Sequence, residues 1–384
     1  MSAVFEQPSL WQRLRPRVLG FDGPLAIAIG LLAAIGLVTM YSAGFDHGTR
    51  FVDHGRNMLV ALVILVVVSQ VGPQRLAALA VPIYTIGVAL LIATALFGIS
   101  KKGATRWLNV GIVIQPSEIL KLATPLMLAW WFQRCEGRLK LVDWFVALAI
   151  LALPVGLVFK QPDLGTAILI LSAGVYVIFF AGLSWRLILP VVLLGAVAVV
   201  ALIASEPTIC QPEVRWPLLK EYQQQRVCTL LDPTKDPLGK GFHILQGMIA
   251  IGSGGALGKG FMQGTQTHLE FIPERTTDFV FAAFSEEFGL VGTLGLLLAF
   301  TFLLLRGLFI AAEAPTLFAR LLAGSITLSI FTYVFVNMGM VTGILPVVGI
   351  PLPFVSYGGT AMVTMGLALG ILMSIARSRR LMQS

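Results

Sequence analysis

Charged residues are scarce in this sequence. Asp, Glu, Lys and Arg make up 12% of the 384 residues, about half of the roughly 25% found in an ordinary soluble domain. Hydrophobic residues make up 57%, and the mean hydropathy is +0.87. One buried core could not hide so many apolar side chains, and they come in long blocks that must face lipid. The composition excludes a water-soluble globule and predicts a polytopic membrane protein.

Histidine and cysteine are also rare, with four and three residues respectively, and none shows metal-ligand spacing. Cys210 and Cys228 lie 18 positions apart in one polar segment. A disulfide and two unpaired thiols are both compatible with this spacing, because spacing alone does not supply the geometry. Cys135 lies outside this segment and is expected to stay reduced.

A nucleotide-binding loop is absent as well. The run 253–260 reads Ser-Gly-Gly-Ala-Leu-Gly-Lys-Gly, whereas a P-loop needs Gly at its first position and Ser or Thr after Lys. We interpret these glycines as allowing tight turns or close packing of a short re-entrant helix.

What the sequence does contain is ten apolar blocks, each near the length of about 20 residues that a membrane-spanning helix needs. The alternating pattern of a membrane barrel is absent, and helices satisfy every backbone group in lipid. The predicted fold is a membrane all-α bundle forming a single domain over 1–384, with the first block as an uncleaved span. The ten predicted spans are 23–43, 57–72, 77–98, 116–133, 143–160, 164–182, 185–205, 278–305, 317–340 and 357–376.

The formal net charge of +8 indicates topology rather than a nucleic-acid partner, because the basic residues flank the apolar blocks. With a cytoplasmic N-terminus, the inner segments hold thirteen Lys and Arg and the short outer loops hold six. The positive-inside rule therefore places both termini in the cytoplasm. The long segment 206–277 then forms a large outer, periplasmic loop, and long ordered loops usually carry function.

Two ionisable groups open the fourth predicted span. Pro116 suits the first turn of a helix, and Glu118 and Lys121 follow on one helix face. Charges at membrane depth are costly, so each needs a partner, a wet cavity or a function. An ion pair that joins helices and a pair that lines a polar cavity both remain open at this stage.

Further candidates begin the sixth and eighth spans. Asp278 follows Arg275 and precedes an apolar run, where it could act chemically or simply cap the helix. Asp163 is expected to cap the sixth span. Glu286 and Glu287 lie deeper, and we interpret one of them as a hydrogen-bonding residue inside the bundle rather than a catalytic one.

An outward-facing polar cavity at the level of the lipid headgroups suits a substrate with a lipid tail and an anionic head. Joining a hydroxyl to a sugar activated by polyprenyl diphosphate requires a base for the hydroxyl proton and cations for the departing diphosphate. Asp278 could supply the base, and the candidate cations are Lys121, Arg106, Lys102 and Arg275. A flippase for the same lipid would also need cations in a cavity.

Several motifs are specific enough to suggest a family. They are Arg106-Trp107-Leu108, Gln115-Pro116-Ser117-Glu118, Asp236-Pro237-Leu238-Gly239, the run 250–255, Gly264-Thr265-Gln266, Leu269 to Phe279, Glu286-Glu287-Phe288-Gly289, and Gly343 to Gly359. Together they resemble the SEDS family of shape, elongation, division and sporulation proteins from the first span to the last. The residues that precede Asp278 are more similar to the RodA (elongation) type than to the FtsW (division) type.

The resemblance implies a ten-span bacterial inner-membrane peptidoglycan glycosyltransferase that polymerises lipid II onto a lipid-linked nascent glycan. It also implies a class B penicillin-binding protein, a transpeptidase, as partner within the elongation machinery. Through the Pro-Glu-Arg-x-Thr-Asp-Phe motif, the family's essential acidic residue corresponds to Asp278, and Glu118 and Lys121 match the family's cavity pair. Thr276 stands where relatives often have His, which excludes an Asp–His relay, and the stretch 210–226 is longer than in the family.

The resulting hypothesis is an inverting transfer in which Asp278 deprotonates the 4-hydroxyl of an acceptor sugar. Lys121, Arg106, Lys102 and Arg275 bind phosphates, and Glu118 orients Lys121. No sequence feature demands a cofactor, although Mg²⁺ or Mn²⁺ between Asp278 and the diphosphate is compatible with the site. The alternatives are a lipid II flippase, an FtsW-type paralogue and a structural scaffold. The Pro-rich run 345–354 is interpreted as a rigid re-entrant turn rather than a hinge or a partner-binding surface.

Overall fold

The computed structural model describes residues 21–46, 48–101, 104–109, 111, 113–137, 139–211, 214, 216, 221–235, 239–272 and 274–383. Helices occupy all ten ranges predicted to span the membrane. Their bounds are α2 Gly23–Ala43, α3 Arg50–Val68, α4 Pro73–Phe97, α5 Pro116–Arg134, α6 Leu141–Lys160, α7 Leu164–Phe180, α8 Trp185–Ile209, α12 Val280–Ala312, α13 Leu317–Val341 and α14 Gly359–Gln383.

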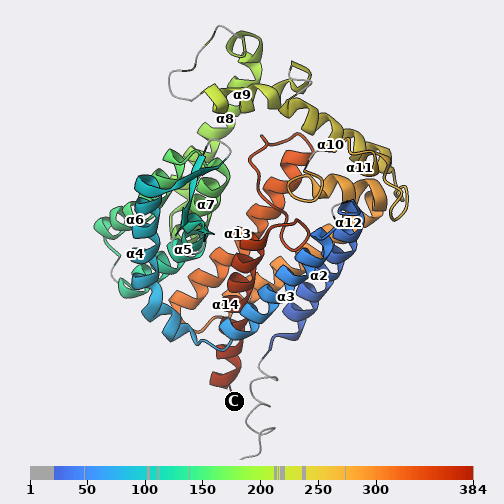
Figure 1. The fold of residues 1–384 in the computed structure, drawn as a ribbon. Coiled ribbons are helices and arrows are strands. Elements are labelled where there is room, and N and C mark those ends of the chain that lie inside the picture. Colours follow the sequence, from blue (N-terminus) through green and yellow to red (C-terminus); the bar gives the residue numbers. More distant parts are fainter. Residues whose placement is uncertain are drawn as a thin grey trace, which may run out of the picture.

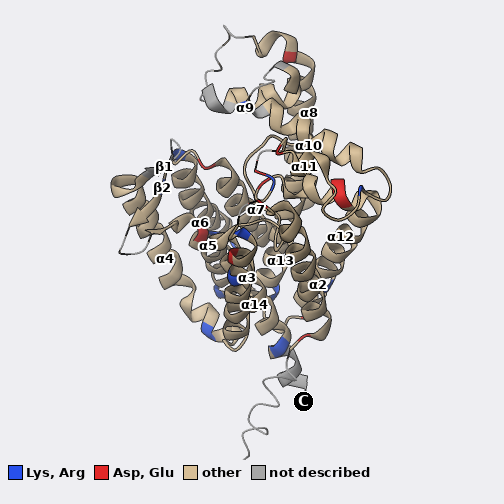
Figure 2. Ribbon diagram, turned by 45° about the vertical axis from the view of Figure 1, so that its right-hand side comes forward, with Lys and Arg blue, Asp and Glu red and all other residues tan. Residues whose placement is uncertain are grey.

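Eight of these helices are long and apolar enough to cross a membrane, which confirms the membrane α-helical class. α7 is shorter, with 17 residues, and α5 carries Glu118, Lys121 and Arg134. The count of ten spans therefore stays a prediction. Figure 2 shows that the long helices are almost free of charged residues along their lengths, as a lipid-facing bundle requires.

α13 and α14 form the centre of the bundle (Figure 1). About 72% of the apolar window of each is buried. On one side α13 packs against α5 and α7, with α4 and α6 outside them; on the other side α14 packs against α3, and α12 packs against α13 and α2. The largest buried side chains of the core come from several of these helices and include Phe132, Phe300 and Phe318.

The remaining elements lie at the end of the bundle opposite the C-terminus (Figure 2), the end that the sequence predicts to be the outer one. Three short strands, β1 Ile99–Lys101, β2 Ala104–Asn109 and β3 Val113–Ile114, pair antiparallel in that order between α4 and α5. The segment 206–277 contains α9 Glu221–Leu231, the 3-10 helix η1 Pro233–Lys235, α10 Lys240–Gly254 and α11 Thr265–His268. None of these elements was predicted individually, because each depends on pairing or packing with distant residues.

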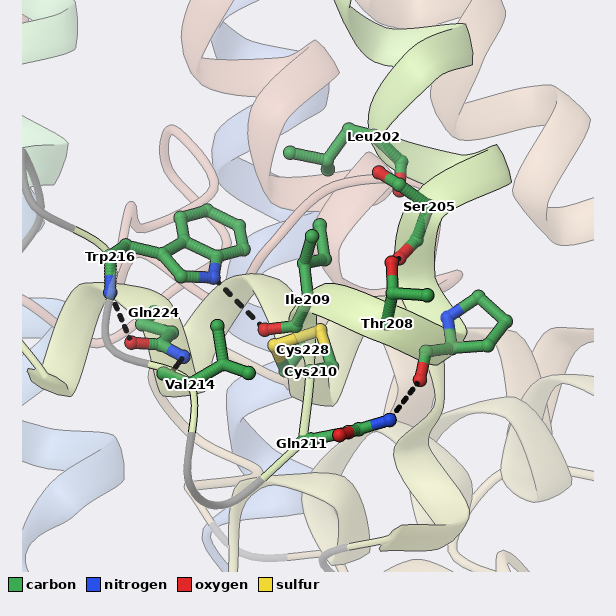
Figure 3. The surroundings of a disulfide bond; sticks show 11 residues. Leu202, Ser205, Thr208, Ile209, Cys210, Gln211, Val214, Trp216, Gln224 and Cys228 are labelled. Atoms are coloured by element: carbon green, nitrogen blue, oxygen red, sulfur yellow. Dashed lines mark hydrogen bonds between the residues drawn. A yellow bond between two sulfur atoms is a disulfide. The ribbon is translucent and has the colours of Figure 1, made fainter.

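α8 differs from the other long helices because none of its residues is buried. Its outer end is joined to α9 by a disulfide between Cys210 and Cys228, so the paired alternative is confirmed. Figure 3 shows the closed loop, in which Trp216 Nε1 donates to the carbonyl of Ile209 at 3.0 Å. Gln224 Nε2 also donates to the carbonyl of Val214 at 2.6 Å.

Two acidic caps begin helices. Asp163 Oδ1 accepts from the amide of Thr166 at 3.2 Å, which confirms that Asp163 caps α7. Asp22 accepts from the amide of Leu25 at 3.0 Å. Its second oxygen pairs with Arg306 of α12 at 2.5 Å, so this cap also ties the first helix to a distant one.

α12 is interrupted at Gly289, whose φ of 62° is not helical. In lipid, the backbone groups freed by a break need partners. The amides of Leu290 and Val291 donate to the carbonyls of Gly255 and Ala256 at 2.9 and 3.0 Å. The amides of Lys259 and Gly260 in turn donate to the carbonyls of Glu286 and Glu287, both at 3.0 Å.

Glycine is required in this joint, because a Cβ on Gly258 would lie 2.1 Å from the carbonyl oxygen of Glu287. The glycine run therefore serves close packing, as predicted. Glu286 is fully buried and accepts from Lys259 Nζ at 2.7 Å and from the amides of Gln266 and Thr267 at 2.8 and 3.0 Å. Its role as a hydrogen-bonding residue inside the bundle is confirmed.

Candidate active site

Asp278 lies in the turn that leads into α12 and is partly exposed. The N-cap of α12 is Phe279, so Asp278 does not occupy the capping position. Asn337 Nδ2, from α13, donates to the backbone carbonyl of Asp278 at 3.0 Å and to that of Ile350 at 2.7 Å. One buried amide thus holds the Asp278 turn beside the Pro-rich segment.

Glycine makes room for the Asp278 carboxylate. A Cβ on Gly349 would lie 3.2 Å from Asp278 Oδ2, and Gly349 has a φ of 73°. The carboxylate therefore faces the segment 345–358, whose residues 352–356 are buried. Ser356 Oγ donates to the carbonyl of Thr277 at 2.6 Å, and the amide of Tyr357 donates to the carbonyl of Thr276 at 2.8 Å. This burial and bonding support the interpretation of the Pro-rich run as a rigid turn.

Arg275 is buried in the same turn, with 5% of its surface exposed. Its guanidinium forms an ion pair with Asp46, donates through Nε to the carbonyl of Ala43 at 3.0 Å and lies 5.4 Å from the centroid of the Phe45 ring. These contacts fasten the turn to the outer end of α2. The charge that the sequence offered as a phosphate ligand is thus already matched by a carboxylate.

Glu118 and Lys121 form the buried ion pair of the site. Lys121 Nζ lies 2.5 Å from Glu118 Oε1, and the side chains are 8% and 14% exposed. Glu118 Oε2 accepts from Thr364 of α14 at 3.0 Å, while Lys121 Nζ lies 5.5 Å from the ring centroid of Tyr333 on α13. The pair therefore joins three helices.

One member of this pair, Lys121, also borders a cavity. A cleft of about 370 Å³, partly open to solvent, is lined by Lys121, Tyr333 and Thr364 together with apolar side chains of α5, α7, α13 and α14. A second cleft of about 240 Å³ lies under the segment 351–358 and shares Tyr333 and Met365 with the first. The two clefts are therefore neighbours that share part of their walls. The ion pair joins helices, and its Lys121 also lines a cleft.

α13 connects this cleft to Asp278. Tyr333 and Asn337 are one turn apart, so they lie on one face of the helix. Lys121 contacts the first, and the Asp278 backbone is bonded to the second. The Asp278 turn is thus bonded to a residue one helical turn away from the ring that Lys121 contacts.

The other predicted cations lie apart from this pair. Arg106, on β2, donates through Nη2 to the carbonyl of Pro162 at 2.6 Å, and its Nε lies 3.7 Å from Asp163 Oδ2. Lys102 lies outside the described residues. Among the described residues, no cluster of three or more His, Cys, Asp and Glu side chains is placed to hold a metal ion.

Sequence reasoning missed Asn337, Tyr333 and Arg50 as parts of the site. Asn337 is fully buried in a largely apolar span, and an amide side chain at membrane depth is itself a signal. In the predicted topology, Arg50 is one of the six Lys and Arg residues of the short outer loops. Its Nη1 donates to Thr276 Oγ1, two residues before Asp278, and no sequence signal connects two positions so far apart.

Comparison with known proteins identifies a family over nearly the whole chain. The family model of cell cycle proteins named for FtsW, RodA and SpoVE matches residues 23–381. Peptidoglycan glycosyltransferase MrdB of Escherichia coli is 48% identical over 361 residues, which cover 93% of this chain and 94% of that protein.

Two solved structures share the fold. A chain of a peptidoglycan synthase complex that coordinates polymerization and crosslinking matches with a TM-score of 0.76 and 33% identity, covering 94% of this chain and 98% of the other. The rod shape determining protein RodA of Thermus thermophilus matches with a TM-score of 0.68 and 27% identity, covering 94% and 97%. The chain belongs to the FtsW/RodA/SpoVE family, the SEDS proteins, and within it to the RodA type of multi-pass inner-membrane proteins.

Proposed function

We propose that this protein is a peptidoglycan glycosyltransferase that polymerises lipid II into glycan strands for cell-wall elongation, with Asp278 as general base. The observation that carries the proposal is the position of Asp278. Asp278 is partly exposed, and its carboxylate faces the segment 345–358, which lines one cleft; Lys121 lines a neighbouring cleft that shares Tyr333 and Met365 with the first. A general base has to be open to substrate, and it has to be held in place by its surroundings; Asn337 holds this one.

In the proposed step, the 4-hydroxyl of the acceptor sugar attacks the anomeric carbon of the lipid-linked glycan. The new bond joins the hydroxyl oxygen to that carbon while the bond from the carbon to the diphosphate breaks. Asp278 takes the hydroxyl proton, and the polyprenyl diphosphate leaves with the bonding electrons. A single displacement of an α-linked diphosphate inverts the anomeric configuration.

Cations near the developing negative charge lower the barrier of such a step. We assign the deeper phosphate contact to Lys121, which Glu118 holds in place. Arg106 remains a candidate at the rim beside Asp163, and Lys102 remains a candidate from its sequence position. We assign Arg275 to fixing the turn that carries Asp278, because its buried guanidinium is held by Asp46 and by the carbonyl of Ala43 at the end of α2.

A divalent cation remains part of the proposal as an accessory. Mg²⁺ is commonly held by one or two carboxylates together with substrate phosphates, and Asp278 offers one such carboxylate. The roles assigned above to Asp278 and Lys121 do not depend on it.

We also propose that both termini are cytoplasmic and that Asp278 acts on the periplasmic side. The asymmetry of Lys and Arg supports this orientation. A class B penicillin-binding protein is the proposed partner, since the structural relative belongs to a complex that combines polymerization with crosslinking.

The lining of the cleft supports an enzyme over a flippase. A flippase needs a polar path toward the inner leaflet, whereas below Lys121 the lining consists largely of Leu169, Ile326, Ile330, Met365 and Ala368. A scaffold without activity is the third alternative, and it predicts no polymer even from the wild-type protein with its partner present.

The test is product analysis with purified protein in liposomes containing lipid II, with and without the penicillin-binding partner. Wild-type protein should form glycan chains, and Asp278→Asn should reduce kcat by at least about 100-fold while keeping lipid II binding. Asp53→Asn is the matched control, because Asp53 lies on the same side in a surface ion pair with Arg56. Chain formation by Asp278→Asn at the wild-type rate would refute the assignment of the base.

A further inference from the structure

The cations around the Asp278 turn differ in whether a carboxylate already neutralises them. Lys121 is paired with Glu118, Arg106 with Asp163 and Arg275 with Asp46. An ion pair of this kind attracts an incoming anion less strongly, because the partner carboxylate repels it. A diphosphate carries more than one negative charge, so its site needs, in addition to a paired cation such as Lys121, a cation whose charge is not already matched.

Arg50 meets this requirement. It is the first residue of α3, and its side chain reaches the Asp278 turn, where Nη1 donates to Thr276 Oγ1. Its guanidinium carbon lies 5.6 Å from the centroid of the Tyr357 ring. Within the part of the chain that the structure describes, no carboxylate pairs with Arg50.

The position of Arg50 relative to the cleft supports the same conclusion. Tyr357 lies between Ser356 and Gly358, which both line the outer cleft, and its amide is bonded to the carbonyl of Thr276. A guanidinium stacked on this ring is therefore held at the edge of the cleft, beside the turn that carries Asp278. Stacking leaves the edge of the guanidinium, with its N–H groups, available for other contacts.

We propose that Arg50 binds the diphosphate of a lipid-linked sugar at the edge of the cleft that Ser356 and Gly358 line, beside the turn that carries Asp278. This assignment rests on the proposed glycosyltransferase function and adds a phosphate-binding residue to it. Arginine suits this role because its planar group forms paired hydrogen bonds with phosphate oxygens. Arg50 is a substrate-binding residue in this proposal, and the proton transfer stays with Asp278.

The experiment measures KM for lipid II, kcat and inhibition by inorganic diphosphate, using full-length protein in liposomes. Arg50→Gln should raise KM and the inhibition constant at least about tenfold, which is the scale of a lost hydrogen bond to a charged group, with a smaller change in kcat. Arg50→Lys should recover part of the lost affinity, because lysine keeps the positive charge but lacks the planar guanidinium that forms paired hydrogen bonds. Arg56→Gln is the matched control on the same helix, since Arg56 is 69% exposed and paired with Asp53.

Two further experiments distinguish diphosphate binding from a purely structural role of Arg50 and from binding to bulk anionic headgroups. If Arg50 only braces the turn, then Thr276→Val, which removes the hydroxyl that Arg50 contacts, should reproduce the kinetics of Arg50→Gln. The diphosphate role instead predicts a much smaller effect of Thr276→Val on the inhibition constant. Repeating the assay in vesicles with and without phosphatidylglycerol tests bulk headgroup binding: an effect confined to the anionic vesicles would overturn the proposal.

The outcomes also distinguish the two proposals. Absence of polymer from wild-type protein with its partner would refute the glycosyltransferase function itself. Polymer from wild-type protein, with equal KM and inhibition constants in Arg50→Gln and Arg56→Gln, would refute only the role of Arg50. A lower melting temperature of Arg50→Gln with unchanged KM would assign Arg50 to stability alone and would equally refute it.

Discussion

Replacing Lys121 with Met should destabilise the bundle more than replacing Lys121 and Glu118 together. Lys121→Met leaves the Glu118 carboxylate with Thr364 as its remaining hydrogen-bond donor among the described residues. Removing one partner of a buried pair costs about 3 to 5 kcal/mol, because the remaining charge stays desolvated. The side chains are 8% and 14% exposed, so the lower end, about 3 kcal/mol, is expected for each single variant.

The double variant Glu118→Gln/Lys121→Met should lose only about 1 kcal/mol. Gln keeps a carbonyl oxygen that can accept from Thr364, Met fills much of the space of Lys, and no unpaired charge is left. The double-mutant cycle should therefore give a coupling energy of several kcal/mol. Unfolding in mixed detergent micelles, followed by the fluorescence of the seven tryptophans, measures all four proteins.

Additive losses below about 1 kcal/mol would refute this reasoning, because they are the behaviour of a solvated surface pair. The same variants also test the second role of the pair. If Lys121 contacts phosphate, the double variant should stay folded and still polymerise lipid II far more slowly than wild type. Normal polymerisation by the folded double variant would limit the pair to joining α5, α13 and α14.

Three further variants test other parts of the structure. Gly289→Ala should lower the unfolding midpoint in a thermal scan, because its Cβ would lie 2.2 Å from the amide nitrogen of Gly258, whereas Gly295→Ala in open space on the same helix should not; equal midpoints would contradict the close joint. Cys210→Ser should speed cleavage of the segment 211–227 by added protease, since the disulfide contributes about 3 kcal/mol of loop closure, and unchanged cleavage would show that the other contacts suffice. Asn337→Leu leaves two loop carbonyls without this donor and should cost about 1 to 3 kcal/mol and reduce kcat, as polymer assays at equal folded concentration would show.

The spans were predictable because length and hydropathy are local properties. The first predicted span, 23–43, has the bounds of α2, and its beginning is marked by the cap Asp22. The Asp163 cap was predictable for the same reason. Helix spans and N-caps depend on residues that are neighbours in the chain, so the sequence alone is enough to predict them.

Contacts between distant residues were not predictable in this way. The partners of Arg275 and Arg106 are Asp46 and Asp163, and no spacing rule links such positions. The β-strands 99–114 depend on pairing between short segments. The interruption at Gly289 also escaped prediction, because a glycine inside an apolar run is compatible with a continuous helix.

The sequence nominated the residues of the candidate site but could not give their arrangement. Charges within apolar segments, and then motif resemblance, selected Asp278, Glu118 and Lys121, and the structure shows how α13 relates them. For the cations, sequence position could not reveal which charges are already neutralised. Arg275 is paired with Asp46, whereas the contacts of Arg50 are Thr276 and Tyr357.

The joint between the glycine run and α12 has a practical consequence for exchanging parts between relatives. A chimera that transplants only the segment 206–277 would separate residues 255–260 from the backbone carbonyls and amides of residues 286–291, to which they are hydrogen-bonded. The natural module for such exchange therefore extends from α10 past Val291, and grafts with a boundary inside it should yield little folded protein.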